Sequence, residues 1–143
     1  MNATIEKFGY PDTLLAEFKH WVVLLRPMQA TLGAMVLAAK SDATRYSDLD
    51  QAAFAELKTI IGNIEAGLDQ AFEPAKYNYL MLMMVDPHVH YHVIPRYGES
   101  KAFAGHQFQD AGWPALPDLG QGVVLDDTLR AALKERLIPY FSG

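Results

Sequence analysis

The sequence predicts an α+β fold in which helices pack on one face of an antiparallel sheet. One segment, residues 50–72, has the apolar periodicity of a long helix. Short apolar segments on either side of it have the length and composition of strands. No internal repeat or linker divides the 143 residues, so we expect a single domain over 1–143.

The segments before the long helix predict one short helix and two strands. Residues 11–20 have the pattern of a helix that is entered through Pro11. Residues 20–26, HWVVLLR, are apolar and rich in β-branched side chains, which predicts a buried strand. Residues 31–40, TLGAMVLAAK, predict a second strand, although their alanines also permit a helix. Gly33 would weaken that helix and fits a bulge or a close approach of the backbone.

The long helix follows a polar loop over residues 41–50. Asp48 or Asp50 can cap it, and Pro74 ends it. Its apolar residues recur at intervals of three and four, which places them on one face of a helix. These residues are Phe54, Leu57, Ile61, Ile64, Leu68 and Phe72.

Two further strands and a second helix are predicted after it. Residues 76–86 and 88–94 are apolar, aromatic and β-branched, and they predict either a hairpin or one long bent strand. Residues 98–122 are rich in glycine and proline and predict an ordered loop. Residues 126–141 predict a final helix, with Asp126 as its cap.

Composition excludes several classes of function. The net charge is −5 and no Lys/Arg cluster is present, which argues against binding to long nucleic acid but leaves mononucleotides open. The absence of cysteine excludes disulfides, thiolate nucleophiles and Cys-based metal sites. The N-terminus lacks a signal-peptide pattern, and the longest apolar run, residues 79–85, is too short to span a bilayer. We therefore expect a cytoplasmic protein that is not associated with a membrane.

Three of the five histidines, His88, His90 and His92, stand at alternate positions. Side chains alternate between the two faces of a strand, so these three imidazoles share one face, with neighbouring Cα atoms about 6.5–7 Å apart. The residues between them are apolar and are expected to face the core. These are Val89, Tyr91 and Val93.

Three interpretations of this row are open. The histidines can be surface residues on the wet face of a sheet. Two of them can chelate a zinc ion with a third ligand, for which Asp86 and His106 are the candidates. They can also carry out phosphoryl or nucleotidyl transfer, in which an imidazole nitrogen attacks phosphorus while its other nitrogen is held by a hydrogen bond and nearby groups serve the phosphate oxygens.

The third interpretation coincides with a known pattern. The run HVHYHVI over 88–94, followed by PRY, resembles the signature of the histidine triad (HIT) family of nucleotide hydrolases and transferases. TLGAMVLAAK is similar to the glycine-containing strand of that family, and DLDQAAFAEL is similar to the opening of its central helix. The resemblance covers a motif-bearing core of about 20–97, followed by a C-terminal loop and helix over 98–143.

The resemblance implies a HIT-like fold, with a five-stranded antiparallel meander sheet, and a homodimer. It implies a small-molecule substrate in which a nucleoside phosphate is joined in an ester, polyphosphate or phosphoramidate, and a covalent nucleotidyl-histidine intermediate. By motif position His90 is the nucleophile, His92 touches the phosphate or the leaving group, and His88 orients or relays protons. No metal is required by this chemistry, although a divalent ion such as Mg²⁺ can accompany polyphosphate substrates.

The sequence departs from the family pattern around the triad. Asp86 and Pro87 stand where many members have a polar phosphate-binding loop, and Arg26 stands where many have a ribose-binding Asn or Asp. Arg26 and Arg96 are candidates to hold phosphate instead. Asn78 is the third candidate substrate-binding residue. Because of these departures, a nucleotide-binding module with little turnover remains as an alternative to an enzyme. A His-based metal-binding protein is a further alternative, which the histidine spacing leaves open.

Overall fold

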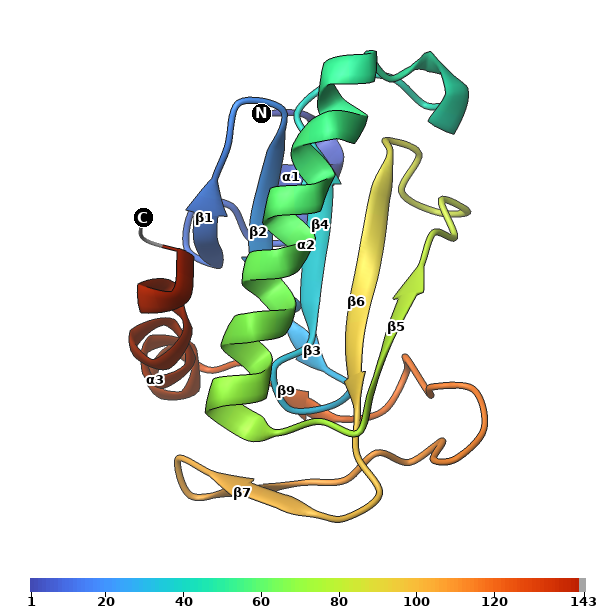
Figure 1. Cartoon of the computed structure of the whole chain (residues 1–143). Helices are drawn as coiled ribbons and strands as arrows, with labels where there is room; N and C mark the ends of the chain where they lie inside the picture. The colour runs from blue at the N-terminus through green and yellow to red at the C-terminus, as the bar shows by residue number, and fades with distance from the viewer. Residues whose placement is uncertain (142–143) are drawn as a thin grey trace.

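A five-stranded antiparallel sheet with the strand order β1-β2-β4-β6-β5 lies at the centre of the molecule (Figure 1). The structure is a computed structural model that describes residues 1–141. The strands of the sheet are β1 (Leu14–Glu17), β2 (Trp21–Leu25), β4 (Met35–Ala39), β5 (Lys76–Leu80) and β6 (His90–Arg96). The remaining strands form two small sheets: β3 (Met28–Gln29) with β9 (Val123–Val124), and β7 (Lys101–Phe103) with β8 (His106–Phe108).

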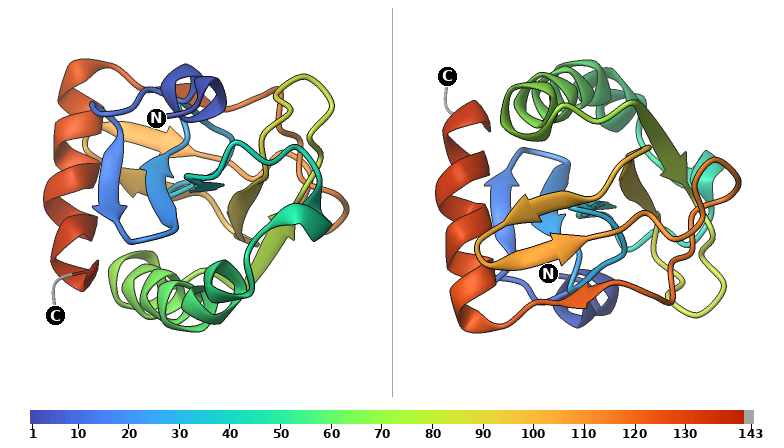
Figure 2. Two further views of the ribbon diagram at one scale, coloured as in Figure 1. Left: turned by 90° about the horizontal axis from the view of Figure 1, so that it is seen from above. Right: turned by 90° about the horizontal axis from the view of Figure 1, so that it is seen from below.

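Helices lie on both sides of the central sheet. The long helix α2 (Gln51–Phe72) crosses one face, and α3 (Asp127–Leu137) lies beside the β1 edge (Figure 1). A short helix, α1 (Ala3–Lys7), lies on the side of the sheet opposite to α2 (Figure 2). Two short 3-10 helices, η1 (Tyr46–Asp48) and η2 (Ile138–Phe141), complete the elements. No helix within residues 1–141 is both long and apolar enough to cross a membrane.

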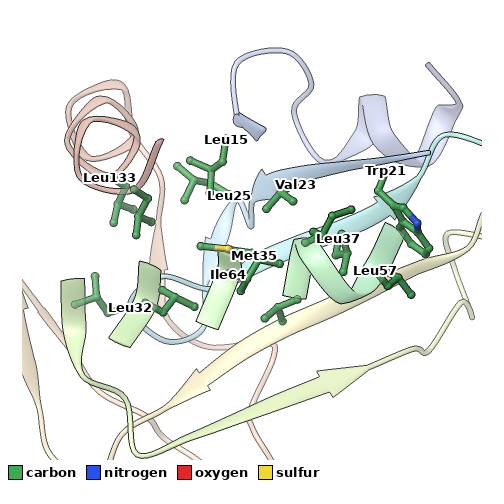
Figure 3. Packing of buried hydrophobic residues seen from close by; sticks show 14 of the residues in the cluster. Leu15, Trp21, Val23, Leu25, Leu32, Met35, Leu37, Leu57, Ile64 and Leu133 are labelled. Carbon is green, nitrogen blue, oxygen red and sulfur yellow. The ribbon is translucent and has the colours of Figure 1, made fainter. Parts of the chain in front are cut away.

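The main hydrophobic core fills the space between α2, α3 and the sheet (Figure 3). Trp21 is fully buried in it and donates its indole N–H to the carbonyl oxygen of Ala53 on α2 at 2.8 Å. A smaller apolar cluster lies on the other face of the sheet, under α1. Its buried members are Ile5, Val22, Leu24, Val36 and Ala38. Both faces of the sheet are therefore covered where the middle strands run.

The predicted α+β fold class is confirmed, but the helices do not all pack on one face of the sheet, because Ile5 of α1 packs on the face opposite to α2. The structure has the five-stranded antiparallel sheet, the long central helix and the C-terminal helix. The helix predicted over 50–72 begins at Gln51 and ends at Phe72, and the side chain of Asp126 caps α3 by accepting from the backbone N–H of Leu129 at 2.8 Å. The two strands after α2 form a hairpin rather than one bent strand, because β5 and β6 pair antiparallel.

Several predicted boundaries are wrong. The helix predicted over 11–20 is a strand, because Leu14–Glu17 pairs with β2 and tertiary pairing overrides the local pattern. The strand predicted over 76–86 ends at Leu80. Phe54 is 37% exposed, because the buried stripe of α2 passes through Ala53 instead. Gly33 lies in a turn before β4, not within a strand.

Candidate active site

The histidine row lies on the face of the sheet that α1 covers. His90 and His92 belong to β6, and alternation along this strand turns both rings away from α2. Val89 and Val93 point to the other face and are fully buried in the main core. The two rings are close neighbours, with centroids 5.2 Å apart. His88 lies two residues before the start of β6.

The ring of His90 is held in one tautomer by the backbone. Its Nδ1 lies 2.7 Å from the carbonyl oxygen of His88. A carbonyl oxygen only accepts hydrogen bonds, so Nδ1 carries the proton. The Nε2 atom of the neutral ring then has a free lone pair. His90 thus has the form that a nitrogen nucleophile requires, although the residue is only 1% exposed.

The ring of His92 is held in the opposite tautomer by Arg26. The Nε–H of Arg26 donates to Nδ1 of His92 at 3.1 Å. A guanidinium has no acceptor atom, so Nδ1 of His92 is unprotonated and the proton of the neutral ring lies on Nε2. Burial, followed by the charges of Arg26 and His90, lowers the pKa of His92 to about 4, against an opposing contribution from Asp86. His92 is therefore a neutral hydrogen-bond donor at physiological pH.

The ring of His88 is oriented by a side chain of α1. Its Nδ1 lies 2.8 Å from the hydroxyl oxygen of Thr4, which is itself buried. A hydroxyl both donates and accepts, so this contact orients the ring without fixing its tautomer. His88 is therefore the member of the row whose proton can sit on either nitrogen.

Helix α1 and the residue after it close the site. The ring of Phe8 contacts both imidazoles, with centroid distances of 5.5 Å to His90 and 5.7 Å to His92. Lys7 forms an ion pair of 2.7 Å with Asp86, in the segment before the triad. These contacts explain why His90 is almost entirely shielded from solvent.

The start of α1 is fixed by the side chain of Asn2. Its Oδ1 accepts from the backbone N–H of Ile5, and its amide donates to the carbonyl oxygens of Ala39 and Ser41, both at 3.0 Å. The same residue therefore caps α1 and joins it to the end of β4. This anchoring gives α1 a defined position over the triad.

The position of Arg26 is set by the turn between β2 and β4. The amide of Gln29, which is fully buried, donates to the carbonyl oxygens of Arg26 and Ala34 and accepts from the N–H of Gly33. Gly33 has φ +85°, and a Cβ there would lie 2.7 Å from the Cδ2 atom of Leu68. A glycine is therefore required at this close approach.

Arg26 also holds the C-terminal loop. Its Nη1 donates to the carbonyl oxygens of Met28 at 2.9 Å and Leu119 at 3.2 Å. Among residues 1–141, none accepts from its Nη2. Burial lowers the pKa of Arg26 from its ordinary value, but a guanidinium remains protonated in proteins. The side chain therefore places a fixed positive charge beside His92.

Asn78 and Arg96 lie together, further along the same face of the sheet. Asn78 is opposite Ile94 in the register of β5 and β6. Its Oδ1 accepts from Nη1 of Arg96 at 2.8 Å, while Nε and Nη2 of Arg96 form two hydrogen bonds with Asp110, at 2.6 and 3.0 Å. The guanidinium also lies over the ring of Trp113. All three guanidinium nitrogens of Arg96 are therefore engaged within the protein.

These residues border an open pocket of about 340 Å³. It is lined by Lys76, Asn78, Arg96, Trp113, Pro114, Ala115 and Leu116. Of the three predicted substrate-binding residues, the structure thus places Arg26 on a triad ring and the other two in this neighbouring pocket. Their contact with a substrate remains a prediction.

Comparison with known proteins assigns the chain to a family. The profile of the HIT domain matches residues 8–99, well over half of the chain. The chain belongs to the HIT domain family. A comparison with curated proteins finds no match.

Solved structures of histidine triad proteins resemble this HIT protein over nearly its whole length. One from Sinorhizobium meliloti has a TM-score of 0.75 at 18% identity and covers 97% of this chain and 94% of its own. One from Marinobacter aquaeolei has a TM-score of 0.68 at 23% identity and covers 94% of this chain and 92% of its own. A hypothetical histidine triad nucleotide-binding protein from Sulfolobus tokodaii has a TM-score of 0.67 at 17% identity and covers 96% of this chain and 88% of its own. At these identities the similarity shows the fold.

The alternative of a metal centre in this HIT protein finds no support in the geometry. Among the described residues, no group of three His, Cys, Asp or Glu side chains is arranged to hold a metal ion. Of the two candidate third ligands, Asp86 is paired with Lys7, and His106 belongs to β8. The Nδ1 atom of His92 is already occupied by Arg26.

Sequence reasoning missed the contribution of the N-terminus. Thr4 and Phe8 contact triad rings, but no helix over residues 3–7 is among the sequence predictions. A signal was present, because Asn2 is a favourable cap and Glu6 follows in the first turn. Thr4 and Arg26, which contact Nδ1 of His88 and of His92, are tertiary partners and have no local signal.

Proposed function

We propose that this protein is a nucleotide-binding hydrolase or nucleotidyl transferase that works through a covalent nucleotidyl-His90 intermediate. The observation that carries the proposal is the hydrogen bond between Nδ1 of His90 and the carbonyl oxygen of His88. It leaves Nε2 as a lone-pair nucleophile. Neighbouring groups of the same face, His92 and Arg26, supply a hydrogen-bond donor and a positive charge for a phosphoryl group.

The reaction has two steps. In the first, the Nε2 lone pair of His90 attacks the phosphorus of a nucleoside phosphate, the P–N bond forms, and the bond to the leaving group breaks. In the second, a water molecule attacks the same phosphorus, the P–N bond breaks, and its electron pair returns to Nε2. The water loses a proton, and a nucleoside monophosphate is released. We assign the orientation or relay of protons to His88, whose ring contacts the hydroxyl of Thr4.

Substrate contacts are assigned to Arg26, Asn78 and Arg96. Arg26 has the strongest case, since its Nη2 makes no hydrogen bond to any described residue and its charge lies beside His92. Asn78 and Arg96 border the open pocket on the same face of the sheet. The chemistry requires no resident metal, and a divalent ion such as Mg²⁺ can accompany a polyphosphate. With a net charge of −5, we expect dissolved nucleotides in the cytoplasm rather than long nucleic acid as partners.

A panel of AMP phosphoramidates and diadenosine polyphosphates tests the proposal. We expect release of AMP by the wild-type protein and a loss on the order of 10³-fold or more in His90→Ala. His106→Ala is the matched control, because His106 lies in β8, outside the site. A rapidly quenched reaction should also show an AMP adduct on the peptide that contains His90. Undiminished turnover by His90→Ala would contradict the assignment of the nucleophile.

A nucleotide-binding module with little turnover is the second candidate. The burial of His90, which is 1% exposed beneath Phe8, favours it. Calorimetry with AMP and GMP separates the two functions, because tight binding without turnover across the whole panel supports the module.

We also propose a homodimer. Strand β5 forms an edge of the central sheet, and edge strands present unpaired backbone groups to a partner. Size-exclusion chromatography with light scattering should give twice the chain mass of 15.9 kDa. A monomer at micromolar concentration would contradict this expectation.

A further inference from the structure

The hydrogen bond from Arg26 to His92 restricts what His92 can do for a leaving group. We infer that His92 donates a hydrogen bond but no proton, so that the site is built for nucleotides whose leaving group departs as an anion. This inference rests on the proposed function. The substrate class that fits is a nucleotide in anhydride linkage, such as a dinucleoside polyphosphate, in preference to a phosphoramidate.

The first step of the argument concerns the proton on His92. Arg26 donates from Nε to Nδ1 of His92 and has no atom that accepts in return. Proton transfer from Nε2 to a leaving group would therefore turn a neutral imidazole into an imidazolate. A second proton on Nδ1 would replace the hydrogen bond by a contact between two positive charges. Neither state is accessible in ordinary acid–base catalysis, so the ring keeps its single proton.

The second step concerns the other groups around the reacting atoms. The Nδ1 proton of His90 is held by the carbonyl oxygen of His88 and stays on the ring during attack. Arg26 does not release its proton, and Asp86 is paired with Lys7. His88 is on the other side of His90 along the strand from His92. None of these described residues supplies a proton on the His92 side.

The bond changes then balance only for one kind of leaving group. His90 Nε2 forms the P–N bond, and the electron pair of the breaking P–O bond goes to the departing phosphate oxygen. That oxygen leaves as an anion, stabilised by the Nε2–H of His92 and the charge of Arg26. An amine or alkoxide needs a proton at this stage. Because general acid catalysis is worth about 10²–10⁴-fold, its absence penalises these substrates.

A leaving-group series tests the inference in the wild-type protein. AMP aryl esters of graded phenol acidity, an AMP alkylphosphoramidate and a diadenosine polyphosphate share the same nucleotide. We expect kcat/KM to fall steeply as the leaving group becomes more basic, with the alkylphosphoramidate about 10²-fold below the polyphosphate. Equal turnover of the two, or a flat dependence on phenol acidity, would overturn the inference. Failure of every member would instead overturn the proposed function, and the leaving-group preference with it.

Two variants of Arg26 form a matched pair. In Arg26→Gln the amide nitrogen is as many bonds from Cα as the Arg Nε, whereas Arg26→Met places a methyl group there. Both variants lose the positive charge and the Nη1 contacts to Met28 and Leu119, and only Arg26→Gln keeps a polar group, with a donor N–H, that can face Nδ1 of His92. We expect Arg26→Gln to keep the leaving-group dependence. Arg26→Met should reduce the ratio of kcat/KM for the polyphosphate to kcat/KM for the phosphoramidate about tenfold, because His92 becomes free to take and give a proton.

Nitrogen-15 NMR of the imidazole rings gives a readout that does not depend on turnover. His92 should carry its proton on Nε2 in the wild-type protein and in Arg26→Gln, and His90 should carry its proton on Nδ1. In Arg26→Met the Nδ1 of His92 should become protonated as the pH falls toward 6. A wild-type His92 with its proton on Nδ1 would overturn the inference whatever the activity. Circular dichroism of each variant establishes that it is folded.

Discussion

Lys7 and Asp86 join the N-terminal helix to the segment that precedes the triad, with Nζ and Oδ1 2.7 Å apart. Asp86 occupies the place where the sequence departs from the family pattern. Its partner shows one contact that the departure adds, because the carboxylate is paired with a side chain of α1. The side chain of Asp86 is 18% exposed and that of Lys7 is 55% exposed, so the pair lies at the rim of the closed site.

Removal of this ion pair should favour access to the site. In Lys7→Gln we expect kcat/KM to rise about two- to fivefold, which corresponds to the usual strength of a partly exposed pair. Added salt should raise kcat/KM of the wild-type protein in the same direction and have less effect on the variant, because screening weakens the pair. Lys40→Gln is the control, since it breaks a comparable pair with Glu17 away from the triad. A Lys7→Gln variant with the same kcat/KM as the wild type would show that this ion pair does not restrict access to the site.

Phe8 should control the reactivity of the nucleophile toward small reagents. The Phe8 ring covers both imidazoles, and His90 is 1% exposed. In Phe8→Ala we expect diethylpyrocarbonate to modify His90 at least several-fold faster than in the wild type, as measured by peptide mass spectrometry. His106 provides an internal reference, because its rate should be equal in both proteins. Equal rates at His90 would show that α1 opens freely without this change.

Stability should depend on pH through His92. The pKa is about 4 in the folded protein and ordinarily 6.5, so the unfolded chain takes up a proton between these values while the folded protein does not. The contribution of His92 to the free energy of unfolding should therefore be fully present above pH 6.5. It should be lost as the pH decreases toward 4, which lowers the free energy of unfolding by up to about 3 kcal/mol. The charged or titratable groups around the ring are Arg26, His90 and Asp86.

His92→Gln isolates this contribution, because a glutamine does not titrate. Urea unfolding at pH 7 and pH 5 should show a smaller loss of stability on acidification in the variant than in the wild type. An identical loss in both proteins would mean that His92 takes up its proton while folded.

The ion pair of Arg96 and Asp110 should contribute strongly to stability. The two side chains are 5% and 1% exposed and are joined by two hydrogen bonds. In Asp110→Ala we expect a loss of about 3–5 kcal/mol, because a buried guanidinium is left without its partner. The double variant Asp110→Ala with Arg96→Met should lose less than the single one. Arg130→Gln, which breaks an exposed pair on α3, should change thermal stability by no more than about 0.5 kcal/mol.

Local patterns predicted the parts of this fold that local interactions determine. The periodicity from Leu57 to Phe72 defined α2, and alternation at His90 and His92 put both rings on one face. Leu14–Glu17 was predicted wrongly, because its strand conformation comes from pairing with β2 rather than from its own residues.

The chemistry of the triad depends on contacts that a sequence pattern does not contain. The resemblance to the family motif implies different roles for His90 and His92, and the structure adds the contacts by which the two rings differ: the carbonyl of His88 at one and Arg26 at the other. Arg26 is 66 positions away from His92 in the chain. The shielding of the site by Phe8 is likewise a long-range contact.

The contact of Phe8 with both imidazoles has a consequence for the fate of the covalent intermediate. In the proposed mechanism, a P–N bond on His90 beneath Phe8 would be kept away from bulk water, so its lifetime would depend on how often α1 opens. During each opening, water competes with any alcohol or phosphate that has entered. The frequency with which this five-residue helix opens would thus set the lifetime of the intermediate, and the competition between water and the other acceptor would set the balance between hydrolysis and transfer.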